Sequence, residues 1–156
     1  MKVVLHNIRS MHNVGAIFRT SDAAGIEKIY LCGFTPSPLD EFGKVRVQVH
    51  KVALGAEKYV DWEKHDKTYA LLDQLKEDGH KIYAVELSDN SIPYYKEKLT
   101  KEDKDKAVIV LGHELEGLSP AILKRADKVI EIPMMGKKHS LNVSVAFGVI
   151  VYGMLY

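Results

Sequence analysis

A single arginine within a helix pattern is the first group in the sequence whose type suggests chemistry. Arg19 lies six residues after Asn13 in the segment NVGAIFRTSDAAG, with two apolar residues directly before it. A partly buried arginine requires an anion or a carboxylate as its partner. The glycine two residues after Asn13 would let a ligand approach the first turn of the helix closely. The segment therefore indicates either an anion site or an internal salt bridge, for example between Arg19 and Asp22.

A second candidate segment is an apolar strand pattern that runs into a glycine-containing loop, VIVLGHELEGLSP. The residues of interest there are Gly112, Glu114 and Gly117. Ligands bind at the carboxyl ends of strands in open α/β sheets, and glycines are frequent at such places. The spacing matches neither a phosphate-binding loop with its Lys-Ser or Lys-Thr ending nor a dinucleotide fingerprint. Considered alone, the segment is as consistent with a plain turn as with a binding loop.

The third segment, IPMMGKKHSLNVSVA, places polar and cationic side chains before an apolar helix pattern. Ser140 is expected to cap that helix, and Asn142 is expected in its first turn. The amide of Asn142 needs hydrogen-bond partners among apolar neighbours. Simple helix capping is one explanation of these residues. The other is a ligand site in which the helix start supplies donors while Lys137, Lys138 and His139 attract phosphates.

The remaining sequence alternates between strand and helix patterns. Apolar runs rich in Val and Ile predict buried strands over residues 2–8, 26–33, 81–88, 106–112 and 128–134. Helices are predicted over residues 13–24, 66–79, 118–127 and 140–156, and residues 34–57 are predicted as a loop followed by a short ordered piece. Asn13 is the expected N-cap of the first helix, and Gly25 its end. The alternation predicts an α/β fold with a mostly parallel sheet flanked by helices on both faces.

Composition bounds the class of protein. The 156 residues fit one domain that is long enough to bury a core without disulfides or metals. The formal net charge of +1 does not by itself indicate nucleic acid, and the local clusters of Lys and Arg fit either a solvated surface or an RNA contact. No run is long enough for a membrane helix, and Cys32 has no partner cysteine, which indicates a cytosolic protein. The seven histidines include no pair at helical spacing, so no metal site is expected.

Taken together and in this order, the three segments resemble the SpoU/TrmH family of RNA 2′-O-ribose methyltransferases, in the SPOUT superfamily. The residues that carry the resemblance are Asn13, Gly15 and Arg19 of a first motif, Gly112, Glu114 and Gly117 of a second, and Pro133, Met134, Gly136, Ser140, Leu141 and Asn142 of a third. The resemblance extends over about the whole chain. One departure is Gly153, where family members often carry a glutamate.

The resemblance implies both an architecture and a reaction. It implies that residues 1–156 form a single SPOUT catalytic domain with a deep trefoil knot at the C-terminal end, acting as a homodimer in the cytoplasm. Because the first motif begins almost at residue 1, no N-terminal RNA-binding extension is expected. The implied reaction moves a methyl group from S-adenosylmethionine to a ribose 2′-hydroxyl in tRNA or rRNA, with no metal and no membrane.

The resemblance also assigns roles to residues. Arg19, Asn13, Glu114, Ser140 and Asn142 are the implied catalytic residues. S-adenosylmethionine is expected near Leu87, Leu111, Gly112, Gly117, Ile132, Pro133, Met134, Ser140 and Leu141. A guanidinium holds its proton strongly, so Arg19 is expected to clamp a phosphate and stabilise a developing oxyanion rather than act as a base. An RNA-facing strip is expected from Arg9, Lys44, Arg46, Lys137 and Lys138, with an affinity that falls steeply with salt.

Two other functions remain open at this point. The same scaffold could be a catalytically silent RNA-binding module, although such a module has no need to keep all five implied catalytic residues. Alternatively, the chain could be a small α/β protein that binds another nucleotide, which calorimetry with S-adenosylmethionine, ATP and NAD would separate. The sequence does not specify the target RNA, its position or its base.

Overall fold

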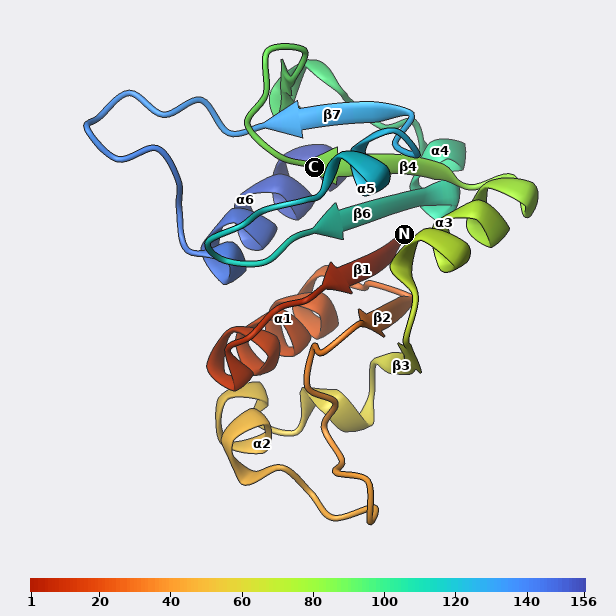
Figure 1. The fold of residues 1–156 in the computed structure, drawn as a ribbon, viewed down its shortest axis with the longest axis vertical. Coiled ribbons are helices and arrows are strands. Elements are labelled where there is room, and N and C mark those ends of the chain that lie inside the picture. Colours follow the sequence, from red (N-terminus) through yellow and green to blue (C-terminus); the bar gives the residue numbers. More distant parts are fainter.

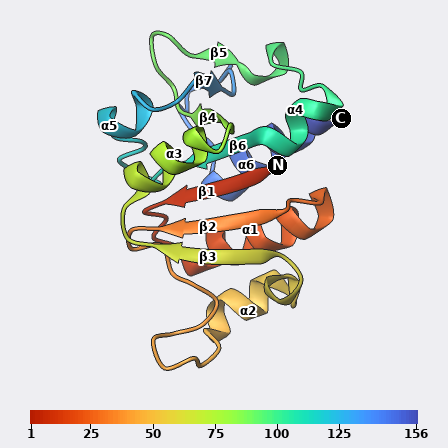
Figure 2. The same ribbon diagram turned by 90° about the vertical axis from the view of Figure 1, so that its right-hand side faces the viewer.

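A seven-stranded sheet in which every hydrogen-bonded pair is parallel forms the centre of the computed structural model, which describes residues 1–156 (Figures 1 and 2). The strands are β1 (Lys2–His6), β2 (Lys28–Cys32), β3 (Asp61–His65), β4 (Lys81–Val85), β5 (Ile92–Pro93), β6 (Ala107–Leu111) and β7 (Lys128–Glu131). Their spatial order is β3-β2-β1-β6-β4-β7-β5. All the strands therefore end at the same edge of the sheet, where ligands bind in folds of this kind.

Helices cover both faces of this sheet, as the alternation of patterns predicts. The helices are α1 (Met11–Ala24), α2 (Val47–Ala53), α3 (Thr68–Glu77), α4 (Lys101–Lys106), α5 (Pro120–Leu123) and α6 (Val143–Leu155), with 3-10 turns η1 (Ala56–Lys58) and η2 (Tyr94–Lys96). On one face α1 packs against α2 and α6, and α3 and α5 lie on the other (Figure 2). None of these helices is both long and apolar enough to cross a membrane.

Two apolar cores form because successive strand side chains point to opposite faces of the sheet. In β1, Val3 and Leu5 join the core beneath α1, α2 and α6, whereas Val4 joins the core beneath α3 and α5. All five residues of β6 are buried, which explains why the central strands appear in the sequence as continuous apolar runs. The predicted strands and the mostly parallel sheet are confirmed.

The start of α1 differs from the prediction. Ser10 is the N-cap, and its hydroxyl accepts the N–H of Asn13 at 3.2 Å. The prediction that Asn13 caps this helix is therefore wrong, because Asn13 lies buried in the first turn with its side chain available for other bonds. Gly25 ends the helix as predicted, in the left-handed conformation with φ of 68°.

The start of α6 also differs, and again a different residue is the cap. The helix begins at Val143, and the side-chain oxygen of its N-cap Asn142 accepts the N–H of Ser144 at 2.9 Å. The prediction of a helix from residue 140 capped by Ser140 is wrong. An asparagine caps a helix as well as a serine does, and its NH₂ group can bind a second partner at the same time.

The elements that the sequence does not predict lie mostly at the edges of the sheet. β3, with the sequence DWEKH, pairs only with β2, and β5 pairs only with β7. Charged side chains and proline protect edge strands from pairing with other chains, and they also remove the apolar alternation that predicts a strand. α4 consists entirely of Lys, Glu and Asp, and a capping box at Thr100 and Asp103 starts it.

Candidate functional site

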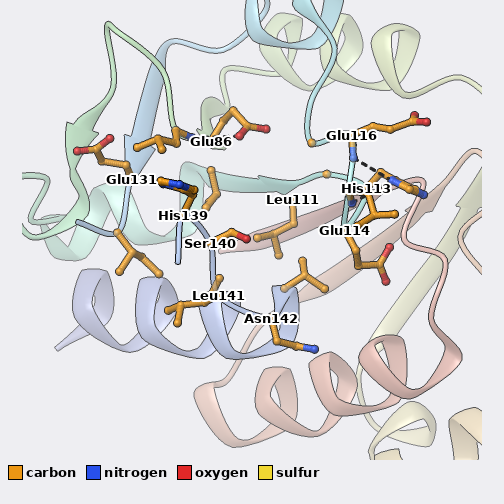
Figure 3. Close-up of a pocket in the computed structure, with 18 of the residues that line it drawn as sticks. Glu86, Leu111, His113, Glu114, Glu116, Glu131, His139, Ser140, Leu141 and Asn142 are labelled. Atoms are coloured by element: carbon orange, nitrogen blue, oxygen red, sulfur yellow. Dashed lines mark hydrogen bonds between the residues drawn. The ribbon is translucent and has the colours of Figure 1, made fainter. Parts of the chain in front are cut away.

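A cavity of about 320 Å³ lies at the carboxyl ends of β4, β6 and β7, beside the start of α6. Figure 3 shows Leu111 at its centre, with Glu86 and Glu131 on one side and Ser140 and Leu141 on another. Of the residues expected to contact the cofactor, the following line it: Leu87, Leu111, Gly112, Gly117, Ile132, Met134, Ser140 and Leu141. Pro133 is not part of the lining.

Two glycines allow the loop after β6 to fold back and form a wall of the cavity. A Cβ on Gly112 would lie 2.5 Å from the carbonyl carbon of Gly117. Gly117 has a φ of 67°, and a Cβ there would lie 2.2 Å from Oε2 of Glu86. Both positions therefore require glycine, because the loop packs closely on itself and on Glu86.

Glu86 and Glu131 are two carboxylates of the cavity wall that the sequence analysis missed. Glu86 directly follows β4, and its two oxygens accept the N–H groups of Leu118 at 2.8 Å and Leu87 at 3.0 Å. Glu131 ends β7 and accepts the hydroxyl of Ser91 at 2.5 Å. The position of both glutamates at strand ends is the sequence signal that could have identified them.

A chain of hydrogen bonds connects the three segments that sequence analysis singled out. Oε1 of Glu114 accepts Nδ2 of Asn13 at 3.0 Å, and Oδ1 of Asn13 accepts Nδ2 of Asn142 at 3.1 Å. The same carboxylate accepts the backbone N–H groups of Arg9 and Ser10, both at 3.0 Å. Glu114 thus fixes the loop before α1, and Asn13 links that loop to the cap of α6.

The pKa of Glu114 is lowered from its usual value of 4.5, although two influences oppose each other. Burial favours the neutral acid and would raise the pKa. The N–H of Arg9, the amide of Asn13 and the N–H of Ser10 all stabilise the carboxylate, and together they outweigh burial. Glu114 is therefore ionised near neutral pH and serves as a fixed hydrogen-bond acceptor.

Arg19 is not partly buried, in contrast to what the sequence pattern indicates. Its side chain is exposed on α1, and it makes no hydrogen bond or ion pair within the chain, so the alternative of a salt bridge with Asp22 is wrong. Arg19 is also absent from the cavity lining. In a single chain, the guanidinium is thus free to bind an anion from outside.

The expected RNA-binding residues lie on three separate loops. Arg9 follows β1, Lys44 and Arg46 precede α2, and Lys137 with Lys138 lie in the loop between β7 and α6. Figure 1 shows the last two loops at opposite ends of the sheet. A single chain therefore does not bring these residues into one strip.

Cys32 is buried, and burial raises the pKa of its thiol to about 11. A thiol that remains protonated at neutral pH packs as a small apolar side chain. No group of three or more His, Cys, Asp or Glu side chains is arranged to hold a metal ion.

The fold is that of a parallel α/β protein with a cavity at the carboxyl ends of its central strands. Residues 1–152 match the model of the SpoU rRNA Methylase family, and the chain belongs to this family. Over 150 residues it is 39% identical to the tRNA (guanosine(18)-2′-O)-methyltransferase of Aquifex aeolicus. The matched region covers 96% of this chain and 66% of that protein. The chain thus spans just under two thirds of that relative's length.

Solved structures share the fold across nearly the whole chain. A TrmH/SpoU tRNA modifying enzyme from Aquifex aeolicus superposes with a TM-score of 0.83 at 37% identity, covering 98% of this chain and 72% of that one. An rRNA methyltransferase from Sinorhizobium meliloti with bound AdoMet gives a TM-score of 0.85 at 25% identity, covering 98% and 54%. These likenesses confirm the mostly parallel sheet and the family that the motifs indicated.

Proposed function

We propose that the protein transfers a methyl group from S-adenosylmethionine to the 2′-hydroxyl of a ribose in tRNA or rRNA. Family membership and the names of its relatives support this reaction. The observation that carries it is the chain of hydrogen bonds from Glu114 through Asn13 to Asn142, at the edge of a cavity over the strand ends. A silent RNA-binding module has no need for this network beside a small-molecule cavity.

The cavity suits S-adenosylmethionine in size and in chemistry. Its volume of about 320 Å³ falls within the range of roughly 300–1,000 Å³ that is usual for small-molecule sites. Leu111, Ile132 and Leu141 offer apolar surface to an adenine ring. The carboxylates of Glu86 and Glu131 offer negative charge to a ligand that carries a sulfonium and an ammonium. When bound, S-adenosylmethionine would supply a methyl group on a sulfonium, and the neutral thioether that departs when the methyl is transferred is a good leaving group.

The acceptor is the harder half of the reaction, because a ribose hydroxyl is a very weak acid. In our proposal Arg19 binds an RNA phosphate and stabilises negative charge as it develops on the 2′-oxygen, while that phosphate or a water takes the proton. Ser140 and Asn142 stand where the cofactor and RNA meet. Asn13 and Glu114 hold the start of α1, and hence Arg19, in place.

A homodimer would reconcile this mechanism with the exposed position of Arg19. We infer that Arg19 of one protomer lies beside the cavity of the other. The exposed apolar side chains of Val145 and Tyr152 on α6 support an interface along this helix. The deep trefoil knot and the cytoplasmic location belong to the same proposal, and the packing of α6 against α1 is compatible with a threaded C-terminal segment.

The proposed reaction is tested with purified protein, labelled S-adenosylmethionine, and tRNA and rRNA supplied separately. We expect label in one RNA fraction, and nucleoside mass spectrometry should identify a 2′-O-methylated ribose. The same RNA with a 2′-deoxy sugar at that position should accept no label. RNA binding without any transfer would favour the silent module. Calorimetric binding of ATP or NAD in place of S-adenosylmethionine would favour another nucleotide-binding role.

Gly117→Ala is expected to weaken S-adenosylmethionine binding by about tenfold or more. The new Cβ would displace Glu86 from Leu118, and a positive φ in a residue other than glycine adds roughly 1 kcal/mol of strain or more. Calorimetry measures the affinity. Gly136→Ala is the matched control, because no atom lies within 4 Å of its Cβ position. Equal affinities of the two variants would contradict this account of the cavity wall.

A further inference from the structure

Phe34 is an aromatic side chain that is exposed although its backbone is held firmly. It lies in the turn after β2, at the same edge of the sheet as the cavity, and its side chain is 59% exposed. Oδ1 of Asn7 accepts its N–H at 3.2 Å. Gly33, directly before it, has a φ of 61° and donates its N–H to the carbonyl of His65 at 2.9 Å. Exposure of this ring is therefore not a consequence of a loose loop.

The residue that follows Phe34 is tied down as well. Thr35 is fully buried, its hydroxyl donates to the carbonyl of Leu5 at 2.9 Å, and the same oxygen accepts the N–H of Ile8 at 3.0 Å. Asn7 itself has a φ of 56°, which is uncommon for a residue other than glycine. Such backbone conformations concentrate at functional sites. The bonds on both sides of Phe34 thus hold its backbone in one conformation.

Two neighbours relate this ring to the site already described. The ring of Phe34 meets that of His113 edge to face, with centroids 5.8 Å apart and an angle of 81°. His113 lines the cavity, and its Nδ1 is fixed by the N–H groups of Leu115 and Glu116 at 3.2 and 3.1 Å. Arg9 is bound through its backbone to Glu114, the next residue after His113, and its guanidinium makes no hydrogen bond or ion pair within the chain.

We propose that Phe34 and Arg9 form a nucleotide subsite beside the cavity, in which an RNA base stacks on the ring of Phe34 and its phosphate binds Arg9. An exposed aromatic ring beside an unpaired cation is the combination that binds single-stranded RNA, because every base has a face to stack and every linkage carries a charge. A protein partner could also cover the ring, but it would not need a cation beside it. This proposal rests on the proposed function, and it adds an RNA contact that methyl transfer itself does not require.

The decisive variant is Phe34→Ala, with Phe42→Ala as its matched control. Phe42 is 79% exposed in the same loop, but it has no aromatic neighbour at the cavity. We expect Phe34→Ala to raise the KM for RNA by about tenfold or more, with unchanged affinity for S-adenosylmethionine, and Phe42→Ala to leave both unchanged. Phe34→Tyr and Phe34→Trp should retain RNA affinity, whereas Phe34→Leu, which is apolar but cannot stack, should not.

The salt dependence and fluorescence separate stacking from other roles. Phe34→Ala should keep the wild-type slope of RNA affinity against salt, while Arg9→Gln should reduce that slope by about one unit. The additional indole emission of the Phe34→Trp variant should be quenched by RNA. A Phe34→Leu variant with wild-type affinity, or a Phe34→Ala variant that changes the oligomeric state instead of RNA affinity, would overturn the proposal.

Different results would contradict the proposed function and the nucleotide subsite. If the wild-type protein binds neither S-adenosylmethionine nor RNA, the proposed function itself is wrong. If the wild-type protein methylates RNA but Phe34→Ala and Phe42→Ala have the same KM for RNA, only the nucleotide subsite is wrong.

Discussion

Replacing Arg19 with alanine is expected to abolish methyl transfer, with kcat reduced by roughly a thousandfold or more. The guanidinium is the one free cation that the first motif provides, and the amide of Asn13 is already bonded to Glu114 and Asn142. Because Arg19 is exposed and lies outside the cavity, the variant should fold normally and bind S-adenosylmethionine with unchanged affinity. Single-turnover transfer of labelled methyl, with calorimetry alongside, measures both quantities.

Asp22→Ala is the matched control for this prediction. Asp22 is exposed on the same helix three residues further on, and it was the alternative partner for Arg19. We expect Asp22→Ala to retain activity, since no ion pair joins the two side chains. Equal losses in both variants, or full activity in Arg19→Ala, would remove Arg19 from the mechanism.

A mixture of variants tests whether the active site forms between protomers. At a low S-adenosylmethionine concentration, at which the weakened binding limits the rate, Arg19→Ala homodimers should be inactive and Gly117→Ala homodimers strongly impaired, for different reasons. If Arg19 acts at the partner's cavity, unfolding and refolding them together should restore part of the activity, because the mixed dimer contains one intact site. No restoration would place Arg19 and the cavity on the same protomer.

The central strands are predictable from sequence because their burial on both faces produces continuous apolar runs of neighbouring residues. β6 and β4 are buried on both faces, so Val and Ile accumulate along them in runs that a local pattern detects. β3 escapes detection because an edge strand has charged residues in place of that pattern. The error at Arg19 has a related cause. Two buried residues precede it, but each helical position rotates by about 100°, which turns residue 19 outward.

The site is less predictable, because its main bonds join residues that are distant in sequence. Glu114 and Asn13 are 101 residues apart, and Asn142 and Asn13 are 129 apart. No periodicity encodes such a pairing, and family resemblance nominated the residues without their partners. Both misplaced caps follow from this network. Asn13 was expected to cap α1 but uses its side chain to bridge the other two segments. Asn142, and not Ser140, caps α6, and its NH₂ group donates to Asn13 at the same time.

Replacing Glu114 with glutamine is expected to lower the free energy of unfolding by about 2 kcal/mol at pH 7. Three N–H donors converge on the carboxylate, two on Oε1 and one on Oε2. A glutamine has only one acceptor oxygen, so its NH₂ group must face at least one of these donors in either orientation. Urea unfolding measures the loss, and methyl transfer should fall with it, because the start of α1 is no longer fixed.

The loss should depend on pH with a sign that follows from the lowered pKa of Glu114. A carboxyl group whose pKa is lower in the folded state contributes its full stability above the unfolded pKa, near 4.5, and loses it as the pH falls through the folded pKa. The difference between wild type and Glu114→Gln should therefore be largest at neutral pH and shrink below about pH 4.5.

Glu116→Gln is the matched control, because Glu116 is exposed in the same loop and its carboxylate accepts no hydrogen bond. Its effect on the free energy of unfolding should stay within about 0.5 kcal/mol at every pH. A Glu114→Gln loss that is the same at pH 7 and pH 4 would mean that shape, and not charge, is what the protein needs at this position. The bridge among the three segments would then be a packing feature. A loss that fades with acid would instead identify the ionised carboxylate as the group that holds the first segment of the site against the other two.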